Sequence, residues 1–355
     1  MTREEALLLE RSLEEALAPL HPADWDPPDD GSLAAEAWAL CAELGWDHAG
    51  LPEDLGGMGD DVGPLVILAQ AAGRHPLAMP LVETALARWA LATAGLEQPP
   101  EGAILTVAHD GDALALRPAP GGPEATGRLA RVPWARHARA LVAAGPDGAL
   151  VVVDLEGPGA AVEPHVDLAG QARDDVVLDA VAVAAADGSE GRRAAALLAP
   201  RAEVLRSAQI AGALGRALAL TREHTSRRSQ FGRPLTRFQL VGAHLATMAA
   251  HAALVDAMLD DACRAEDDAA LAASAGSLAL IAAEAATEVA RSAHQCHGAI
   301  GATREYQLHH FTRRLWSWRS DGGGERRRAR TLGERAQAAS AAELWAGTEP
   351  SPLRG

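Results

Sequence analysis

The stretch Arg228-Ser-Gln-Phe-Gly-Arg-Pro-Leu-Thr-Arg-Phe-Gln239 is the most informative part of this 355-residue chain. It uses two of only three phenylalanines, Phe231 and Phe238, within eight residues. The stretch lies between two long alanine-rich runs, and Gly232 and Pro234 predict a tight turn between two helices. We expect Phe231 to anchor this loop in a core and Phe238 to open the following helix.

Four arginines crowd the same turn: Arg227, Arg228, Arg233 and Arg237. A cationic loop that contains glycine and faces the start of a helix favours a bound phosphate group. A solvated basic loop with two hydrophobic anchors is the plainer interpretation. The spacing of the residues alone leaves both open.

The composition excludes several classes of function. All 32 basic residues are arginine, which excludes a P-loop lysine, a pyridoxal-phosphate lysine and a protein-kinase lysine. The net charge of −16 argues against a nucleic acid as partner. The chain contains no run of about 18 apolar residues, so we expect no membrane insertion. The acidic N-terminus and the scattered Cys41, Cys263 and Cys296 predict a cytoplasmic protein with reduced thiols.

Hydrophobic spacing divides the chain into parts. Residues 1–100 have helical periodicity, with apolar runs over 33–44, 62–72 and 81–94. Residues 101–201 contain short alternating runs that predict antiparallel strands, over 103–108, 113–117, 140–144, 149–155 and 176–184. Residues 202–340 predict a helical bundle, with long segments over 205–226, 239–264, 269–297 and 304–319. Residues 341–355 predict a flexible tail. These patterns indicate an α+β fold.

Three segments, in order, resemble signatures of the acyl-CoA dehydrogenase family. Residues 228–239 resemble its R-x-x-F-G-x-P-x-x-x-F-Q motif. Residues 43–59, with LGW and PEDLGGMG, resemble its N-terminal segment, and residues 295–306, QCHGAIGATREY, resemble its Q-x-x-G-G-x-G segment. The resemblance implies an N-terminal helical domain, a shortened antiparallel β domain and a C-terminal four-helix bundle. It also implies FAD as the hydride acceptor and a glutamate that removes the α proton of an acyl-CoA.

The resemblance places that base at one of two positions, and neither holds a clear glutamate. At the first position stands Asp321, which is one methylene shorter, and a turn-forming Asp-Gly is the alternative interpretation. The second position falls on Ala202, with Glu203 one residue away. That shift turns a helical side chain by about 100°. Asp321 and Glu203 are therefore the candidate catalytic residues.

The resemblance implies flavin contacts from the β region and from the bundle, and only those of the bundle have matching residues in this chain. The β region lacks the T-E-P-x-x-G-S-D strand and loop that lie beside a flavin ring, so we do not expect this chain alone to hold one. In the bundle, the resemblance implies contacts to a neighbouring chain's FAD. These would come from Arg228, Phe231, Gln239 and the loop Gln295, Cys296, His297, Gly298 and Ala299, where alanine replaces the usual second glycine.

The C-terminal run RRLWSWR, residues 313–319, resembles the ending of the shorter companion chains in heteromeric bacterial enzymes of this family. The resemblance implies an α2β2 assembly with a longer catalytic chain, an acyl-CoA substrate with a bulky or steroid side chain, and an electron-transfer flavoprotein or similar acceptor. Trp316 and Trp318 cannot share a helix face, so we expect one in the bundle and one at an interface. A self-sufficient homomeric dehydrogenase and a non-catalytic scaffold remain alternatives.

The arginines of residues 326–330 predict a charged helix exterior. Four histidines gather nearby in sequence: His294, His297, His309 and His310. They lack acidic or cysteine partners at ligand spacing other than Cys296. We therefore expect no metal site.

Overall fold

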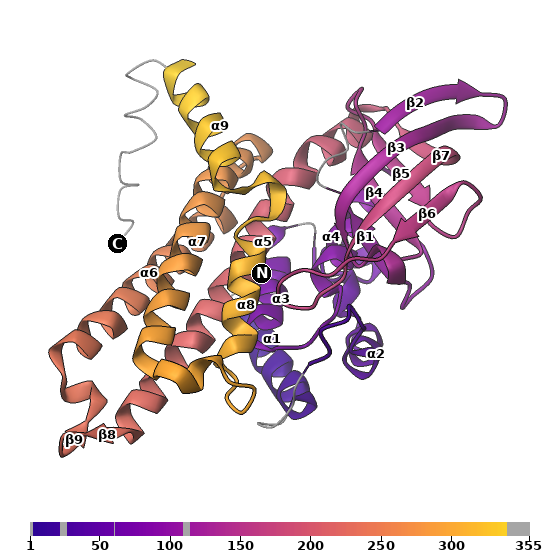
Figure 1. Ribbon diagram of the computed structural model, residues 1–355. Coiled ribbons are helices and arrows are strands. Elements are labelled where there is room, and N and C mark those ends of the chain that lie inside the picture. The colour runs from indigo at the N-terminus through magenta and orange to yellow at the C-terminus, as the bar shows by residue number, and fades with distance from the viewer. Residues whose placement is uncertain (1–2, 22–26, 60, 109–113, 339–355) are drawn as a thin grey trace.

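The computed structural model describes residues 3–21, 27–59, 61–108 and 114–338. Figure 1 shows a sheet on one side of the molecule, a helical bundle on the other and the N-terminal helices between them. The tail expected at 341–355 lies outside the described residues. The three-part division at residues 100 and 201 stays a prediction.

The N-terminal helices are α1 (Arg3–Leu17), α2 (Ala35–Glu43), α3 (Val62–Arg74) and α4 (Leu81–Thr93). Short 3-10 turns η1 (Ala18–Leu20), η2 (Trp46–His48) and η3 (Glu53–Leu55) lie between them. Asp61 caps α3 by accepting a hydrogen bond from the Gly63 amide. The three apolar runs predicted as helices are α2, α3 and α4, and most residues of α3 and α4 are buried.

The sheet contains β1 (Leu105–Val107), β2 (Leu114–Ala119), β3 (Gly122–Pro133), β4 (Ala140–Ala144), β5 (Leu150–Asp154), β6 (Ala160–Glu163) and β7 (Arg173–Ala186). The strand order is β1-β4-β5-β7-β3-β2, and β6 also pairs with β7. All pairs are antiparallel except β1 with β4, which is parallel. The expected antiparallel sheet is therefore a mixed one.

The bundle contains α5 (Ser189–Arg227), α6 (Gln239–Cys263), α7 (Asp268–His297), α8 (Leu308–Trp318) and α9 (Gly324–Ala338). The four predicted helices are present. Helix α5 begins at Ser189, earlier than the expected start at residue 205, and carries Pro200 inside it. Helix α9 follows the short turn η8 (Asp321–Gly323) and is charged as expected, but its Arg328 is buried.

The segment from 228 to 238 forms a two-residue hairpin turn between β8 (Ser229–Gln230) and β9 (Arg233–Pro234), followed by η6 (Leu235–Arg237). The expectation that Phe231 lies in a core is wrong, because its side chain is 91% exposed at the tip of the turn. Its φ of 53° and the φ of 78° at Gly232 are both left-handed, as such hairpin turns require. Phe238 opens α6 as expected.

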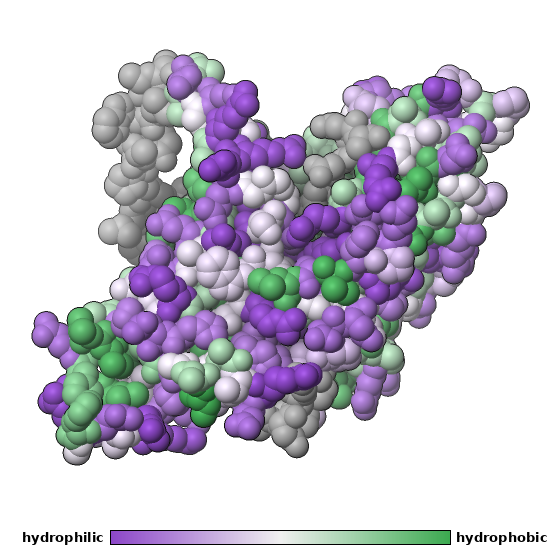
Figure 2. Space-filling model, viewed as in Figure 1, coloured by the Kyte–Doolittle hydropathy of each residue, from purple (hydrophilic) through white to green (hydrophobic). Residues whose placement is uncertain are grey.

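Helix α6 is poorly covered within this chain. Its buried residues are Met248, Val255, Leu259 and Ala262, whereas Leu240 is 78% exposed. Figure 2 shows apolar residues gathered at the lower left, where Figure 1 places the β8–β9 hairpin and the start of α6. An apolar surface of this kind is typical of an interaction site.

Two helical segments, Gln239–Cys263 and Asp268–Ala302, are long and apolar enough to cross a membrane by length and composition alone. Such helices also occur in the cores of soluble proteins, and α7 packs against α5, α6 and α8 within the bundle. The two helices are therefore weak evidence for a membrane, and the expected lack of membrane insertion stays a prediction.

Helices α3 and α5 cross at two glycines, which sets how closely the N-terminal helices approach the bundle. A Cβ atom added at Gly73 would lie 1.9 Å from the carbonyl oxygen of Gln209. A Cβ added at Gly212 would lie 2.0 Å from the carbonyl oxygen of Gln70. No side chain fits at either position without separating the two helices.

We predict that Gly212→Ala lowers the free energy of unfolding by about 1–3 kcal/mol or more, because the new methyl group meets backbone. Gly215→Ala on the same helix is the matched control, since its Cβ would meet nothing within 4 Å. The control should raise stability by about 0.5–1 kcal/mol. Urea unfolding followed by circular dichroism measures both, and equal shifts in the two variants would contradict the close crossing.

Candidate functional site

A cavity of about 780 Å³ lies at the end of the bundle, where α5 and α7 end and α6 begins. The β8–β9 turn and the segment before α8 complete its wall. Residues on that wall include Arg227, Arg228, Phe231, Phe238, His297 and Tyr306. A volume of this size is typical of a site for a small molecule or cofactor.

The structure brings together three of the residues predicted to contact FAD: Arg228, Phe231 and His297 all line this cavity. Gln239 is the first residue of α6 and is exposed. Gln295, Gly298 and Ala299 are exposed near the end of α7 and in η7 (Gly298–Ala302). Cys296 is buried, and burial raises the pKa of its thiol. These four exposed residues and Cys296 are not among the cavity's lining residues.

The charges of the cavity favour an anion. Among the described residues, the Arg228 guanidinium has no ion-pair partner, whereas Glu223 is paired with Arg227 at 2.6 Å. Phe238 precedes α6 and makes no side-chain cap, so the first amides of that helix are left for a ligand. The positive end of the α6 dipole and a free guanidinium together suit a phosphate group.

Aromatic rings form the rest of the wall. The rings of His224 and His297 stack with their centroids 4.4 Å apart, and Tyr306 lies 5.0 Å from His297. Burial lowers the pKa of His297 to about 4, and burial together with Arg228 lowers that of His224. Nδ1 of His297 donates to the Ala293 carbonyl oxygen, 2.8 Å away, because a carbonyl oxygen can only accept. A neutral aromatic wall beside a cationic group suits a planar ring attached to phosphates.

The candidate base Asp321 lies elsewhere, where the sheet, the N-terminal helices and the bundle meet. Its Oδ2 is 3.3 Å from Nη2 of Arg173 and 3.0 Å from Nε of Arg206. Nη2 of Arg206 is also 3.0 Å from Oε1 of Glu83. Burial opposes the charge on Arg173, but Asp321, Asp167 and Glu83 together raise its pKa. Asp321 is thus a member of a buried charge cluster.

The second candidate, Glu203, is also bound by an arginine. Its Oε1 lies 3.2 Å from Nε of Arg328. Arg328 further donates to the backbone carbonyls of Arg319 and Asp321. A proton accepted by either carboxylate would cancel the negative charge with which its guanidinium partners pair. The roles of Arg173 and Arg206 give no local sequence signal, because their partners are distant in sequence. For the same reason the expectation that Arg328 lies on the helix exterior is wrong.

The two tryptophans of the C-terminal run separate as expected. Trp318 is buried, and its Nε1 donates to Oε1 of Gln171 at 3.0 Å. Trp316 is 38% exposed, and the Arg319 guanidinium lies 4.3 Å from its ring centroid. The placement of Trp316 at an interface stays a prediction.

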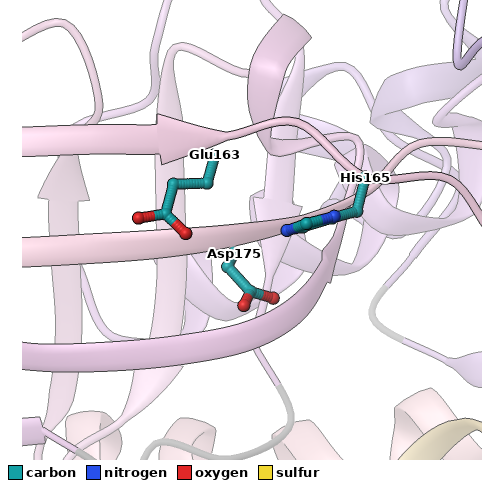
Figure 3. Close-up of side chains that lie close together, drawn as sticks. All are labelled: Glu163, His165 and Asp175. Atoms are coloured by element: carbon teal, nitrogen blue, oxygen red, sulfur yellow. The ribbon is translucent and has the colours of Figure 1, made fainter.

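One group of possible metal ligands occurs in the described part of the chain, formed by Glu163, His165 and Asp175 (Figure 3). Their ligand atoms lie within 4.8 Å of one another. The Arg128 guanidinium already bridges the two carboxylates, at 2.6 Å from Glu163 and 2.8 Å from Asp175. Arg128 therefore supplies the positive charge that a metal ion would otherwise provide between these two carboxylates. The expected lack of a metal stays a prediction.

The comparisons with known proteins agree with this architecture. Residues 4–99 match the acyl-CoA dehydrogenase N-terminal domain, and residues 191–337 match the C-terminal domain. Acyl-CoA dehydrogenase FadE27 of Mycobacterium tuberculosis is 31% identical over 307 residues, which cover 78% of this chain and 81% of that protein.

Two solved structures have the same fold over nearly the whole chain. The ChsE4–ChsE5 complex from Mycobacterium tuberculosis has a TM-score of 0.84 at 25% identity, covering 96% of this chain and 99% of that one. A variant of the Tcur3481–Tcur3483 steroid ACAD has a TM-score of 0.84 at 26% identity, covering 95% and 99%. Members of the family are oxidoreductases that bind FAD. This chain belongs to the acyl-CoA dehydrogenase family.

Proposed function

We propose that this chain is the companion subunit of an FAD-dependent acyl-CoA dehydrogenase, which introduces an α,β double bond into an acyl-CoA thioester. In this proposal the 780 Å³ cavity receives part of an FAD whose flavin ring is held by a longer catalytic chain. The observation that carries it is an asymmetry. In the described part of the chain, the Arg228 guanidinium in this cavity has no ion-pair partner, whereas arginines bind both candidate bases.

The residues of the cavity would bind and orient the cofactor. Arg228 and the first amides of α6 would hold its pyrophosphate, because both supply N–H donors and positive charge. Phe231 and the stacked pair His224 and His297 would pack against its apolar parts and exclude water. The bound FAD supplies a hydride acceptor for the β carbon of the substrate. The base that removes the α proton would come from the catalytic chain.

The names of two structural relatives support the assembly and the substrate class. ChsE4–ChsE5 is a complex of two chains, and Tcur3481–Tcur3483 is called a steroid ACAD. We therefore extend the proposal to a cytoplasmic α2β2 tetramer that acts on a steroid side-chain acyl-CoA and transfers its electrons to an electron-transfer flavoprotein or a similar acceptor. The exposed apolar face of α6 and the hairpin tip would lie in the interface between subunits.

Arg228→Ala should lower the FAD content of the assembled complex while leaving its fold intact. A charge-assisted contact is worth about 1.5–3 kcal/mol, so we expect the FAD affinity to fall about tenfold or more. Arg237→Ala is the matched control, because Arg237 is in the same turn but does not line the cavity. Flavin absorbance per complex and FAD titration of the apo complex measure the effect. Equal FAD affinity in both variants would remove Arg228 from the site.

Asp321→Asn should lower stability rather than turnover. It leaves Arg173 and Arg206 without their shared carboxylate, which costs on the order of 3 kcal/mol for a buried pair. Asp268→Asn is the control, since its ion pair with Arg193 is half exposed and should cost less than about 1 kcal/mol. Turnover per bound FAD should stay within a few-fold.

The same turnover measurement on Asp321→Asn and Glu203→Gln separates the companion from a self-sufficient enzyme. Removing a true base costs roughly 10²-fold or more. A loss of that size in either variant would assign catalysis to this chain.

The assembly itself gives the most direct measurement. If each companion chain completes one FAD site together with one catalytic chain, a tetramer of two companion and two catalytic chains binds two FAD. Light scattering and the ratio of flavin to protein would determine both numbers. A stable, flavin-loaded homotetramer of this chain alone would support the homomeric alternative, and a complex in which this chain leaves FAD affinity unchanged would support the scaffold.

A further inference from the structure

A second cavity, of about 540 Å³, lies where α1 and η1 meet the end of α3, the middle of α5 and the residue before α8. It shares no lining residue with the cavity proposed for FAD. Its polar lining consists of Glu14, His21, Arg74, His75, Arg216 and Gln307. None of these residues has a role in the function proposed above.

Two arginines enter this cavity from different helices, Arg74 at the end of α3 and Arg216 in α5. Within the described parts of the chain, neither forms an ion pair. Arg216 contacts only a neutral acceptor, with its Nη2 3.3 Å from Oε1 of Gln307. The chain has 48 acidic residues for 32 arginines, so carboxylate partners are abundant. Two guanidiniums on the wall of a cavity that lack a carboxylate partner among the described residues indicate a site for an anion.

Two imidazoles adjoin the arginines. His75 is 2% exposed, and its Nδ1 lies 2.6 Å from Nε2 of His21. Burial, Arg74 and Arg216 lower the pKa of His75 to about 4, while burial, His75 and Arg216 lower that of His21 to about 4. Both rings are therefore neutral at pH 7, and each carries one N–H. One N–H is used in the hydrogen bond between the rings, so the pair has one N–H left for Glu14 or a ligand.

A single carboxylate, that of Glu14, lines the cavity, and the Asp256 carboxylate that interacts with Arg74 is not among the lining residues. Oε2 of Glu14 lies 3.1 Å from Nε2 of His75, and the Glu14 side chain is about half exposed. Two guanidiniums against one carboxylate leave a net positive charge in the cavity.

Small residues make room for a ligand. The floor on α5 is formed by Gly215 and Ala219, which lie one turn apart, with Ala18 opposite. A Cβ atom added at Gly215 would meet nothing within 4 Å. The recess is therefore open above the helix backbone, between the two arginines.

We propose that this second cavity binds a small dianion, either a phosphate group or a dicarboxylate, held by Arg74 and Arg216 beside the His21–His75 pair. Two guanidinium groups match a dianion better than a single negative charge, because each can donate a pair of N–H groups to one oxyanion group. The site is separate from the cavity proposed for FAD, and its binding of an anion does not depend on the proposed companion function.

The test is calorimetric titration of the purified holo-complex, or of this chain if it is stable alone, with inorganic phosphate and with succinate at constant ionic strength. We expect saturable binding of one of them, and the one that binds identifies the ligand class. Arg216→Gln and Arg74→Gln should each weaken it about tenfold or more. Arg222→Gln is the control, because Arg222 is exposed on the same helix and lines neither cavity.

Two further variants separate this site from the first cavity and from misfolding. Arg228→Ala should leave phosphate or succinate binding unchanged. Gly215→Leu should abolish it while preserving the circular dichroism spectrum, because the new side chain fills the recess without meeting backbone. Absence of saturable binding for both anions, or binding that is lost in Arg228→Ala and kept in Arg216→Gln, would overturn the proposal.

Discussion

The buried charge cluster around Asp321 is the interaction on which the rest of the structure depends. It joins a residue after α8 to Arg206 of α5, Glu83 of α4 and Arg173 of β7, so it ties together the bundle, the N-terminal helices and the sheet. These side chains are largely removed from water and their opposite charges compensate one another, with Asp167 adding a further carboxylate 3.8 Å from Nη2 of Arg173. The indole of Trp318 reinforces the same junction through Gln171 and lies beneath the Arg206 guanidinium.

The charge cluster at this junction differs in character from the cavity at the open end of the bundle. Two guanidiniums hold the Asp321 carboxylate there, and a carboxylate bound in this way is constrained in position. The open end of the bundle has the opposite character, with a free guanidinium, uncapped amides and exposed aromatic rings. The centre of the chain thus holds its parts together, while the residues proposed to contact a cofactor lie at the open end of the bundle.

The sequence predicted what depends on local pattern and on motif. Helical periodicity located α2, α3, α4 and the bundle helices, and the motifs placed Arg228 and His297 at one cavity. Strand β3 was missed because its two glycines and two prolines are typical of turns, and only pairing with β2 and β7 makes it a strand. The charge cluster could not be predicted, since Arg173 and Asp321 are 148 residues apart. Phe231 was misplaced because its apolar side chain predicts a core position, whereas the two-residue hairpin turn holds it in solvent.

That exposed ring has a consequence for how the protein is produced in a cell. A chain without a partner presents Phe231, Leu240 and the apolar face of α6 to water, and such a surface promotes association between identical copies. Surplus chains would be lost to precipitation or to proteolysis rather than stored. Under the proposed assembly, synthesis of the two chains in matched amounts becomes a requirement of solubility as well as of activity.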